Sequence, residues 1–218
     1  MKICVLIPSY NEESEIAKLI HELQRFSLDI VIVDDGSQDR TAAIAESCGA
    51  KVLRNIRNMG KGATLSRGFD YILNNGYDAV ITMDGDGQHR PEDLPEFLAA
   101  AEPGDAGILI GNRMLDTKNM PFIRVVTNKF MSWLISRIAN QKIHDTQCGY
   151  RLIKAEVLKK IKIETANFEA ESEILIKASE AGFKIRSVPV ETVYAQEKSQ
   201  INPFIDTFRF LKFIIRKR

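Results

Sequence analysis

The chain has 218 residues, and its hydrophobic content of 44% predicts an ordinary packed core in one large or two small domains. Its charged residues nearly cancel, leaving a net charge of +1, which excludes a chain built as a whole to bind nucleic acid. Cys4, Cys48 and Cys148 are an odd set without metal-ligand spacing, so we expect free thiols in a reducing, cytoplasmic compartment. We find neither a signal-peptide pattern nor a run of about 18 apolar residues, so no membrane span is expected.

Apolar runs and helical patterns alternate from the start of the chain. The predicted strands lie at residues 2–7, 30–33, 51–53 and 78–83. Pro8 is expected to stop the first strand, and Asn11 to cap the helix that follows it. A strand followed by a helix, four times over, is typical of a doubly wound α/β sheet.

Polar clusters follow three of these strands, at residues 8–12, 34–37 and 84–89. Ligands of doubly wound sheets bind in the crevice beyond the carboxyl ends of the strands. The strands are recognised by their apolar residues alone, so the independent position of the three polar clusters at the strand ends predicts one shared binding site.

The third cluster contains two aspartates, Asp84 and Asp86, one residue apart after a buried strand. In a regular strand their side chains would point to opposite faces, so the chain must turn here, and Gly85 and Gly87 allow that turn. Two carboxylates held close together repel unless a cation lies between them. Gln88 adds an amide oxygen, and such hard oxygen ligands suit Mg²⁺ or Mn²⁺.

The acidic pair is open to other interpretations. A polar turn without a ligand is the simplest. An EF-hand is excluded, because the positions that need Gly and Glu, counted from Asp84, hold His89 and Pro95. An aspartate-nucleophile phosphatase would carry a Thr soon after the pair, and none is present. The metal site of a nucleotide-sugar transferase stays open.

The second half of the chain continues the alternation. The predicted elements are a helix at 91–101, a strand at 107–110, an unusually apolar helix at 121–139, a short helix after residue 151, an acidic helix at 168–181 and an extended segment at 184–194. Residues 201–218 predict an amphipathic, basic helix suited to the surface of an anionic membrane. Core or dimer packing is the alternative for this helix and for the one at 121–139.

The motifs, in order, resemble those of family 2 glycosyltransferases, most of all the branch of dolichyl-phosphate mannosyltransferases and other polyprenyl-phosphate glycosyltransferases. The motifs are Pro8-Ser9-Tyr10-Asn11-Glu12, Asp34-Asp35-Gly36-Ser37, Gly60-Lys61-Gly62, residues 84–89, Gly111-Asn112-Arg113 and residues 145–151. The resemblance covers residues 2 to about 200. It implies a GT-A fold over residues 1–200, with a mostly parallel sheet flanked by helices, a nucleotide-sugar donor, a divalent metal and an inverting mechanism.

The resemblance also implies roles for particular residues. The residues implied to bind the nucleotide-sugar are Pro8, Tyr10, Glu12, Val33, Asp35, Lys61, Asp84 and Lys198, and those implied to hold Mg²⁺ or Mn²⁺ are Asp84, Asp86 and Gln88. Lys61 can also be interpreted as a solvated residue at the start of a helix. Asp34 and Ser37 can be interpreted as residues that form the turn and cap the helix. His89 is either a hydrogen-bond donor that supports the metal ligands or a residue just before the helix at Pro91, and we favour the second interpretation.

The residues expected to take part in catalysis are Asp86, Arg113, Asp145 and Arg151. A polyprenyl phosphate is anionic near neutral pH, since the second ionisation of a phosphate ester lies near about 6, so it needs cations for positioning. Arg113 and Arg151 suit that role, although a salt bridge is an equal interpretation of Arg151. A hydroxyl acceptor would need a general base, for which Asp145 is the candidate unless it orients Arg151.

Taken together, these patterns predict a metal-dependent, inverting glycosyltransferase that moves a sugar from a GDP- or UDP-sugar to a polyprenyl phosphate. We expect a cytoplasmic protein, peripheral on the cytoplasmic face of the membrane. The alternatives are transfer to a hydroxyl of a saccharide or small acceptor, and a non-catalytic module that binds a nucleotide-sugar. A processive synthase is disfavoured because the chain lacks Gln-x-x-Arg-Trp, with Trp133 its only tryptophan.

Overall fold

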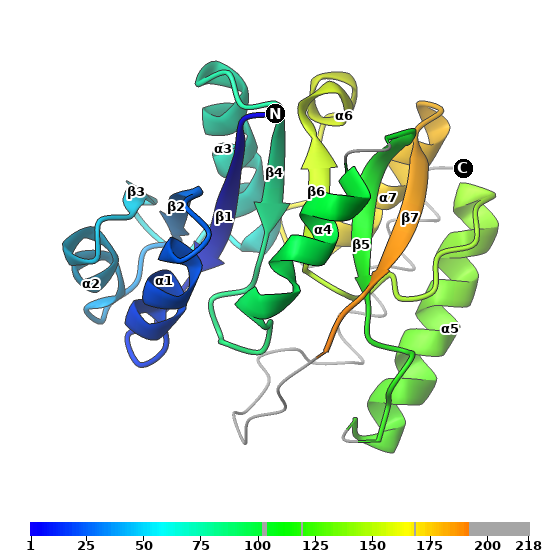
Figure 1. Cartoon of the computed structure of the whole chain (residues 1–218), viewed down its shortest axis with the longest axis horizontal. Coiled ribbons are helices and arrows are strands. Elements are labelled where there is room, and N and C mark those ends of the chain that lie inside the picture. Colours follow the sequence, from blue (N-terminus) through cyan, green and yellow to red (C-terminus); the bar gives the residue numbers. More distant parts are fainter. Residues whose placement is uncertain (102–103, 119, 168, 192–218) are drawn as a thin grey trace.

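The computed structural model describes residues 1–101, 104–118, 120–167 and 169–191. A seven-stranded sheet runs through this part of the chain in the order β3-β2-β1-β4-β6-β5-β7 (Figure 1). The strands are β1 (Ile3–Ser9), β2 (Asp29–Asp34), β3 (Lys51–Arg54), β4 (Ala79–Thr82), β5 (Ala106–Asn112), β6 (Arg151–Lys154) and β7 (Lys184–Pro189). All neighbours pair in parallel except at β6.

Helices cover both faces of the sheet, which is why its central strands are apolar throughout. The helices are α1 (Ile16–Gln24), α2 (Thr41–Ser47), α3 (Lys61–Asn74), the 3-10 helix η1 (Pro91–Asp93), α4 (Leu94–Ala101), α5 (Phe122–Ala139), α6 (Ala155–Lys160) and α7 (Glu169–Glu180). In Figure 1, α1 and α4 lie in front of the sheet, and α3, α6 and α7 lie behind it. The four predicted strand–helix repeats and the mostly parallel sheet are confirmed.

The prediction that Pro8 stops the first strand was wrong. β1 continues to Ser9, and Pro8 is in register with Val33 of β2. The Leu6 carbonyl accepts the Met83 amide on the β4 side, and alternate residues of a strand face the same neighbour. The backbone nitrogen of Pro8 therefore faces the side of β1 on which β4 has already ended. No sheet hydrogen bond would form there, so the absence of an N–H in proline costs none.

The prediction that Asn11 caps the first helix was also wrong. α1 begins at Ile16, and Asn11 adopts a left-handed conformation with φ of 55°. Its side-chain oxygen accepts the Gln38 amide at 2.9 Å, and its own amide donates to Ser37 Oγ at 2.9 Å. Asn11 therefore joins the loop after β1 to the loop after β2.

The antiparallel strand β6 was not predicted. It pairs Ile153 with Val80 of β4 and with Ile108 of β5, so it separates two strands that are parallel to each other. The strand has four residues, and only Leu152 and Ile153 are apolar, a run too short to stand out by periodicity. The predicted short helix after it is α6.

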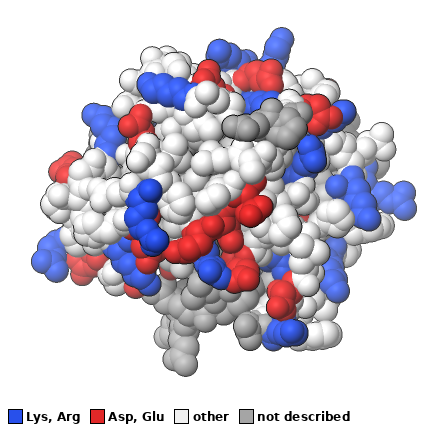
Figure 2. Space-filling view, in the orientation of Figure 1, with Lys and Arg blue, Asp and Glu red and all other residues white. Residues whose placement is uncertain are grey.

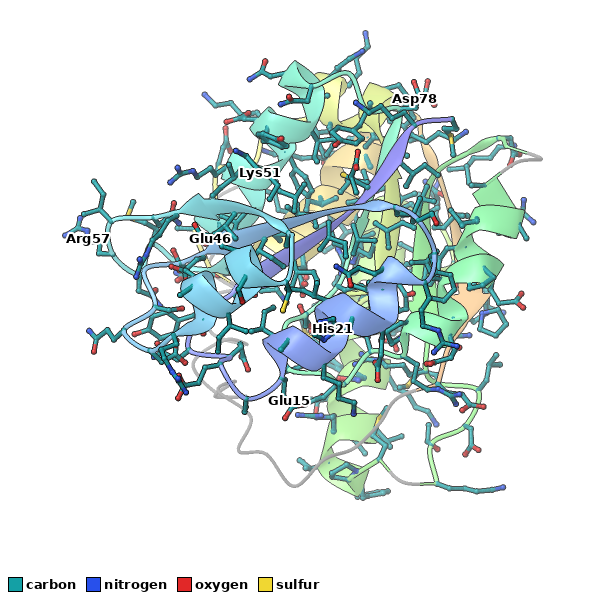
Figure 3. All side chains as sticks on the ribbon, turned by 60° about the vertical axis from the view of Figure 1, so that its left-hand side comes forward. Glu15, His21, Glu46, Lys51, Arg57 and Asp78 are labelled. Carbon is teal, nitrogen blue, oxygen red and sulfur yellow. The ribbon has the colours of Figure 1, made fainter. Side chains whose placement is uncertain are left out.

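The parallel strands all end at one edge of the sheet, and this edge carries the polar clusters. Cys4, Val5, Leu6 and Ile7 of β1 are fully buried, so the strand is anchored by its apolar side chains, each contributing about 1.5–3 kcal/mol. Figure 3 shows Glu15, which follows β1, at the opposite end of the molecule from Asp78, which precedes β4. None of the helices in the described ranges is long and apolar enough to cross a membrane.

The start of α3 packs tightly on the loop before α7. A methyl group on Gly62 would lie 2.3 Å from the Thr165 carbonyl oxygen and 2.7 Å from the Cβ of Ala170. We expect Gly62→Ala to lower the free energy of unfolding by about 1–3 kcal/mol, because overpacking outweighs the better helix propensity of alanine. Urea unfolding measures this, with the exposed Asp70→Ala in the same helix as control. Equal stability of Gly62→Ala and wild type would contradict it.

Candidate active site

The acidic loop follows β4 directly. Met83 remains buried, and its amide donates to the Leu6 carbonyl at 3.1 Å, so the chain leaves the sheet only at Asp84. Gly87 has φ of 69°, a conformation that favours glycine and turns the chain back. The side chains of Asp84, Asp86 and Gln88 come to lie partly exposed at the sheet edge. In Figure 2, acidic side chains gather in the lower centre of the visible face, with basic side chains beside them.

The three polar clusters meet at this edge, as predicted. The Asp35 amide donates to the Ser9 carbonyl at 2.8 Å, and the Glu12 amide donates to Thr41 Oγ1 at 2.8 Å, which joins the first cluster to the second. Gly85 lies so close to the first cluster that a methyl group there would be 2.9 Å from Ser9 Oγ. The acidic loop, the loop after β1 and the loop after β2 therefore form one continuous site.

Asp84 is held in place from three directions. Lys61 Nζ lies 2.6 Å from its Oδ1, and His89 Nε2 lies 3.4 Å from its Oδ2. The backbone of Gly149 approaches so closely that a methyl group there would be 2.8 Å from Oδ2. The expectation that His89 only precedes the helix at Pro91 is therefore corrected, because the buried imidazole also contacts the Asp84 carboxylate.

The two aspartates have opposite electrostatic environments. Although burial opposes ionisation, the Lys61 ammonium and the His89 ring hold the pKa of Asp84 well below its ordinary value. Burial and then the charge of Asp84 raise the pKa of Asp86. Although burial opposes its charge too, Lys61 has a raised pKa because Asp84 and Glu171 both stabilise the ammonium. A cation near Asp86 would relieve this repulsion.

The residues present fit a divalent cation. Asp84, Asp86 and Gln88 supply the hard oxygen donors that Mg²⁺ and Mn²⁺ prefer. Burial and the charge of Asp84 raise the pKa of Asp86, so a cation bound beside it would stabilise its ionised form. Within the described ranges no group of three His, Cys, Asp or Glu side chains is arranged to hold a metal. Asp84, Asp86 and Gln88 would supply part of the coordination of such an ion, as is usual for Mg²⁺ bound together with phosphates.

The residues implied to bind the nucleotide differ in how they are placed. Pro8, Tyr10 and Glu12 are partly exposed beside the acidic loop. Val33 is fully buried in the hydrophobic core, so its side chain does not reach the surface of the site. Its role, like those of the other three, stays a prediction.

Asp35 lies at the centre of a loop contact. Its carboxylate accepts hydrogen bonds from the side-chain amide of Asn55 at 2.7 Å, from the Met59 amide at 2.9 Å and from the Gly60 amide at 2.9 Å. This network fixes the loop that leads into α3 and thereby positions Lys61. The predicted contact of Asp35 with the donor is untested, and its structural role in the loop is clear.

The turn interpretation of Asp34 and Ser37 agrees with the structure. The buried Asp34 accepts the Ser37 amide at 3.2 Å, and Arg54 Nε lies 3.1 Å from its other oxygen. Arg54 also donates to the Ser37 carbonyl at 3.2 Å. Both residues therefore shape the second cluster.

Arg113 and Asp145 form a two-point ion pair. Arg113 Nε and Nη2 donate to the two Asp145 oxygens at 2.7 and 3.0 Å, and the Arg113 amide adds a third contact at 3.2 Å. Asp145 is fully buried, so both its oxygens are engaged away from solvent. The sequence placed Asp145 either as a base or as a partner of Arg151, and the structure pairs it with Arg113.

Arg151 lies beneath the site, 1% exposed. Its guanidinium donates to the backbone carbonyls of Cys148 at 2.8 Å, Glu171 at 2.6 Å and Thr146 at 3.1 Å. These contacts tie the segment before β6 to the start of α7. The structure therefore does not bring Arg151 to the surface where an acceptor phosphate would bind.

Glu171 belongs to the site but was not predicted. Its Oε1 lies 2.9 Å from Lys61 Nζ, so Lys61 bridges Glu171 and Asp84. The sequence signal was only an acidic first turn of α7, which is also the ordinary pattern at a helix N-terminus. Lys198, predicted to contact the diphosphate, lies outside the described residues, as does the predicted helix at 201–218.

Comparison with known proteins identifies the class. The chain matches the model of Glycosyl transferase family 2 over residues 4–162, and it belongs to that family. Its fold is the GT-A fold: the chain superimposes on glucosyl-3-phosphoglycerate synthase from Mycobacterium tuberculosis with a TM-score of 0.79 and 18% identity, over 99% of this chain and 80% of that one. At this identity the likeness shows the fold alone.

Two curated relatives indicate the branch of the family. The chain is 31% identical over 200 residues to the polyprenol monophosphomannose synthase of Mycolicibacterium smegmatis, covering 85% of this chain and 75% of that protein. It is 29% identical over 217 residues to the UDP-N-acetylglucosamine–dolichyl-phosphate N-acetylglucosaminyltransferase of Methanococcus voltae, covering 89% and 86%. The protein is thus a glycosyltransferase that resembles the dolichyl-phosphate branch, as the motifs predict.

The raised pKa of Asp86 leads to a prediction about stability. A carboxyl whose pKa is higher in the folded than in the unfolded chain costs stability at neutral pH, and this cost fades as the pH falls toward the unfolded value of about 3.9. We expect Asp86→Asn to have a higher free energy of unfolding than wild type at pH 7 in EDTA, with the difference shrinking toward pH 4. Denaturant unfolding at both pH values measures this, and Asp70→Asn on the exposed side of α3 is the control. A less stable variant at pH 7 would contradict it.

Proposed function

We propose that this glycosyltransferase uses Mg²⁺ or Mn²⁺ to transfer a sugar, with inversion, from a GDP- or UDP-sugar to a polyprenyl phosphate. The observation that carries the proposal is the position of Asp84 and Asp86, side by side at the sheet edge where the loops after β1 and β2 also end. The names of the two relatives above, both acting with polyprenyl or dolichyl phosphates, support the acceptor. Crystals of the M. tuberculosis synthase with Mn²⁺ and UDP support the metal.

In this proposal Asp84, Asp86 and Gln88 hold the ion, which when bound would offset the charge of the donor diphosphate and of the leaving nucleotide. The base and ribose lie against Pro8, Tyr10, Glu12 and Asp35, and Val33 offers only its backbone, because its side chain is buried in the core. The hydrogen bonds of Asp35 to the Met59 and Gly60 amides, and the close approach of Gly149 to Asp84, position the loops around these residues. Preorganised charge of this kind does not have to rearrange during the reaction.

The arrangement at Asp145 favours a phosphate acceptor over a hydroxyl. A hydroxyl needs a general base, and both oxygens of Asp145 are taken by Arg113 within the protein. A phosphate is already a nucleophile and needs a positioned cation. Arg113, at the end of β5 and fixed in orientation by its carboxylate partner, is the cation we assign to this role.

Helix α5 supports acceptor delivery from a membrane surface. Phe122, Val126, Phe130 and Trp133 lie on one stripe of the helix and are exposed, Phe122 by 81% and Trp133 by 55%. Basic side chains of the same helix flank the stripe. The N-terminal end of α5 lies toward the carboxyl ends of the strands (Figure 1), so a lipid headgroup held there would be near Arg113. We propose that this stripe contacts the lipid surface in the plane of the membrane.

The test uses the purified full chain with labelled GDP-mannose, UDP-glucose or UDP-N-acetylglucosamine and a short polyprenyl phosphate, with Mn²⁺, with Mg²⁺ or with EDTA. The proposal expects a lipid-linked sugar with one donor and none in EDTA. Transfer to phosphoglycerate or a saccharide hydroxyl, but not to the lipid, would favour the hydroxyl alternative. Metal-dependent donor binding without transfer to any acceptor would favour a binding module.

A further inference from the structure

Lys61 is the first residue of α3, and its ammonium group lies between two carboxylates that come from distant parts of the chain. Nζ is 2.6 Å from Asp84 Oδ1 and 2.9 Å from Glu171 Oε1. The three side chains are largely shielded from water, with exposed fractions of 17% for Lys61, 28% for Asp84 and 15% for Glu171. Such a shielded pair is weakened little by salt.

The backbone that carries Lys61 is fixed. The amides of Gly62 and Ala63 donate to the Ala166 carbonyl at 2.8 and 3.2 Å, so these two N–H groups at the start of α3 are already paired. The segment around Ala166 is held by the buried Glu173, whose Oε2 accepts the Thr165 amide at 2.9 Å. Any movement of the ammonium must therefore be a rotation of the side chain alone.

Asp84 cannot move away from Lys61 either. The Gly149 backbone lies against both of its oxygens, and His89 contacts Oδ2. A divalent ion that binds Asp84 and Asp86 must share the Asp84 carboxylate with an ammonium already 2.6 Å away. Two cations on one carboxylate repel, so one of them must weaken its contact.

We propose that Lys61 is a built-in competitor for the metal: it occupies Asp84 when no donor is bound, and the ion displaces it toward Glu171. This inference rests on the proposed metal site at Asp84 and Asp86. Glu171 keeps the displaced ammonium paired inside the protein. The consequence is that the metal alone binds weakly, and that the negative diphosphate of a donor strengthens metal binding by offsetting the added positive charge.

The test measures Mn²⁺ binding to the nucleotide-free full chain, by the loss of the free Mn²⁺ signal in electron paramagnetic resonance. Lys61→Gln should bind Mn²⁺ about tenfold more tightly than wild type, a typical size for coupling between two sites. Glu171→Gln should bind it more weakly, because the displaced ammonium loses its second partner. That loss should be smaller when Glu171→Gln is made together with Lys61→Gln.

Lys184→Gln is the matched control, since this lysine is exposed at the start of β7, far along the chain, and pairs with Asp105. Its Mn²⁺ affinity should equal that of wild type. Tighter binding by Lys61→Gln, including the case in which wild type shows none, supports the inference. Unchanged or weaker binding by Lys61→Gln, with wild-type binding abolished by Asp86→Asn, overturns it and leaves the metal site standing. If no variant binds Mn²⁺, both the inference and the proposed metal site are overturned. If Lys61→Gln unfolds at a low temperature, the Mn²⁺ affinity of Glu171→Gln decides.

Discussion

Replacing Asp86 by Asn should slow metal-dependent sugar transfer by about a thousandfold. The change keeps the size of the side chain and an oxygen to accept the Gln88 amide, which lies 3.0 Å from Asp86 Oδ1. It removes one negative charge from the proposed metal site. A metal contributes several kcal/mol of charge stabilisation, and about 4 kcal/mol corresponds to a factor of about a thousand in rate.

The measurement is the initial rate of lipid-linked sugar formation at saturating donor over a range of Mn²⁺ concentrations. The same variant is expected to be the more stable protein in EDTA, so a loss of activity cannot be assigned to unfolding. Asp70→Asn, on the exposed side of α3, should keep the wild-type rate. A rate for Asp86→Asn within tenfold of wild type at every Mn²⁺ concentration would remove Asp86 from the reaction.

Replacing Arg151 by Met should cost about 3–5 kcal/mol of stability, a loss typical of breaking a buried charged network. The guanidinium is 1% exposed and donates to three backbone carbonyls, and a methionine leaves all three without a donor. Because this network ties Thr146 to the start of α7, part of the site should loosen with it. Denaturant unfolding measures the loss, with the exposed Arg186→Met as control.

The experiment also separates the two interpretations of Arg151. If the residue held the acceptor phosphate, Arg151→Met would retain wild-type stability and raise the acceptor KM. If it only supports the fold, stability falls whether or not acceptor is present. The three carbonyl contacts favour support of the fold, and they leave Arg113 as the arginine assigned to the acceptor.

Elements with a strong local pattern were predictable from the sequence. The four apolar strands and the helices between them follow from hydrophobic period and backbone preference, which depend on near neighbours. The convergence of the three polar clusters followed from the parallel sheet. The prediction for Pro8 was wrong for a related reason. Proline lacks the N–H that a sheet hydrogen bond needs and therefore predicts a strand end, but this lack costs nothing where no neighbouring strand lies on that side.

Charge partners were not predictable in this way. From the sequence, Asp145 is either a general base or the residue that orients Arg151, and the fold pairs it with Arg113. The sequence left Lys61 as a diphosphate contact or a solvated helix start, and the fold places it between two carboxylates. Each partner is chosen by how loops pack after the sheet has formed, and long charged side chains carry no local preference that would reveal it.

The class of fold, the order of the motifs and the edge of the sheet at which they gather could therefore be predicted from the amino-acid sequence, because they depend on apolar periodicity and on the geometry of parallel strands. Three features emerged only from the folded chain: which charges meet at that edge, the antiparallel pairing of β6 and the burial of Arg151. These outcomes depend on contacts between residues many positions apart, whose energies exist only once the chain has folded.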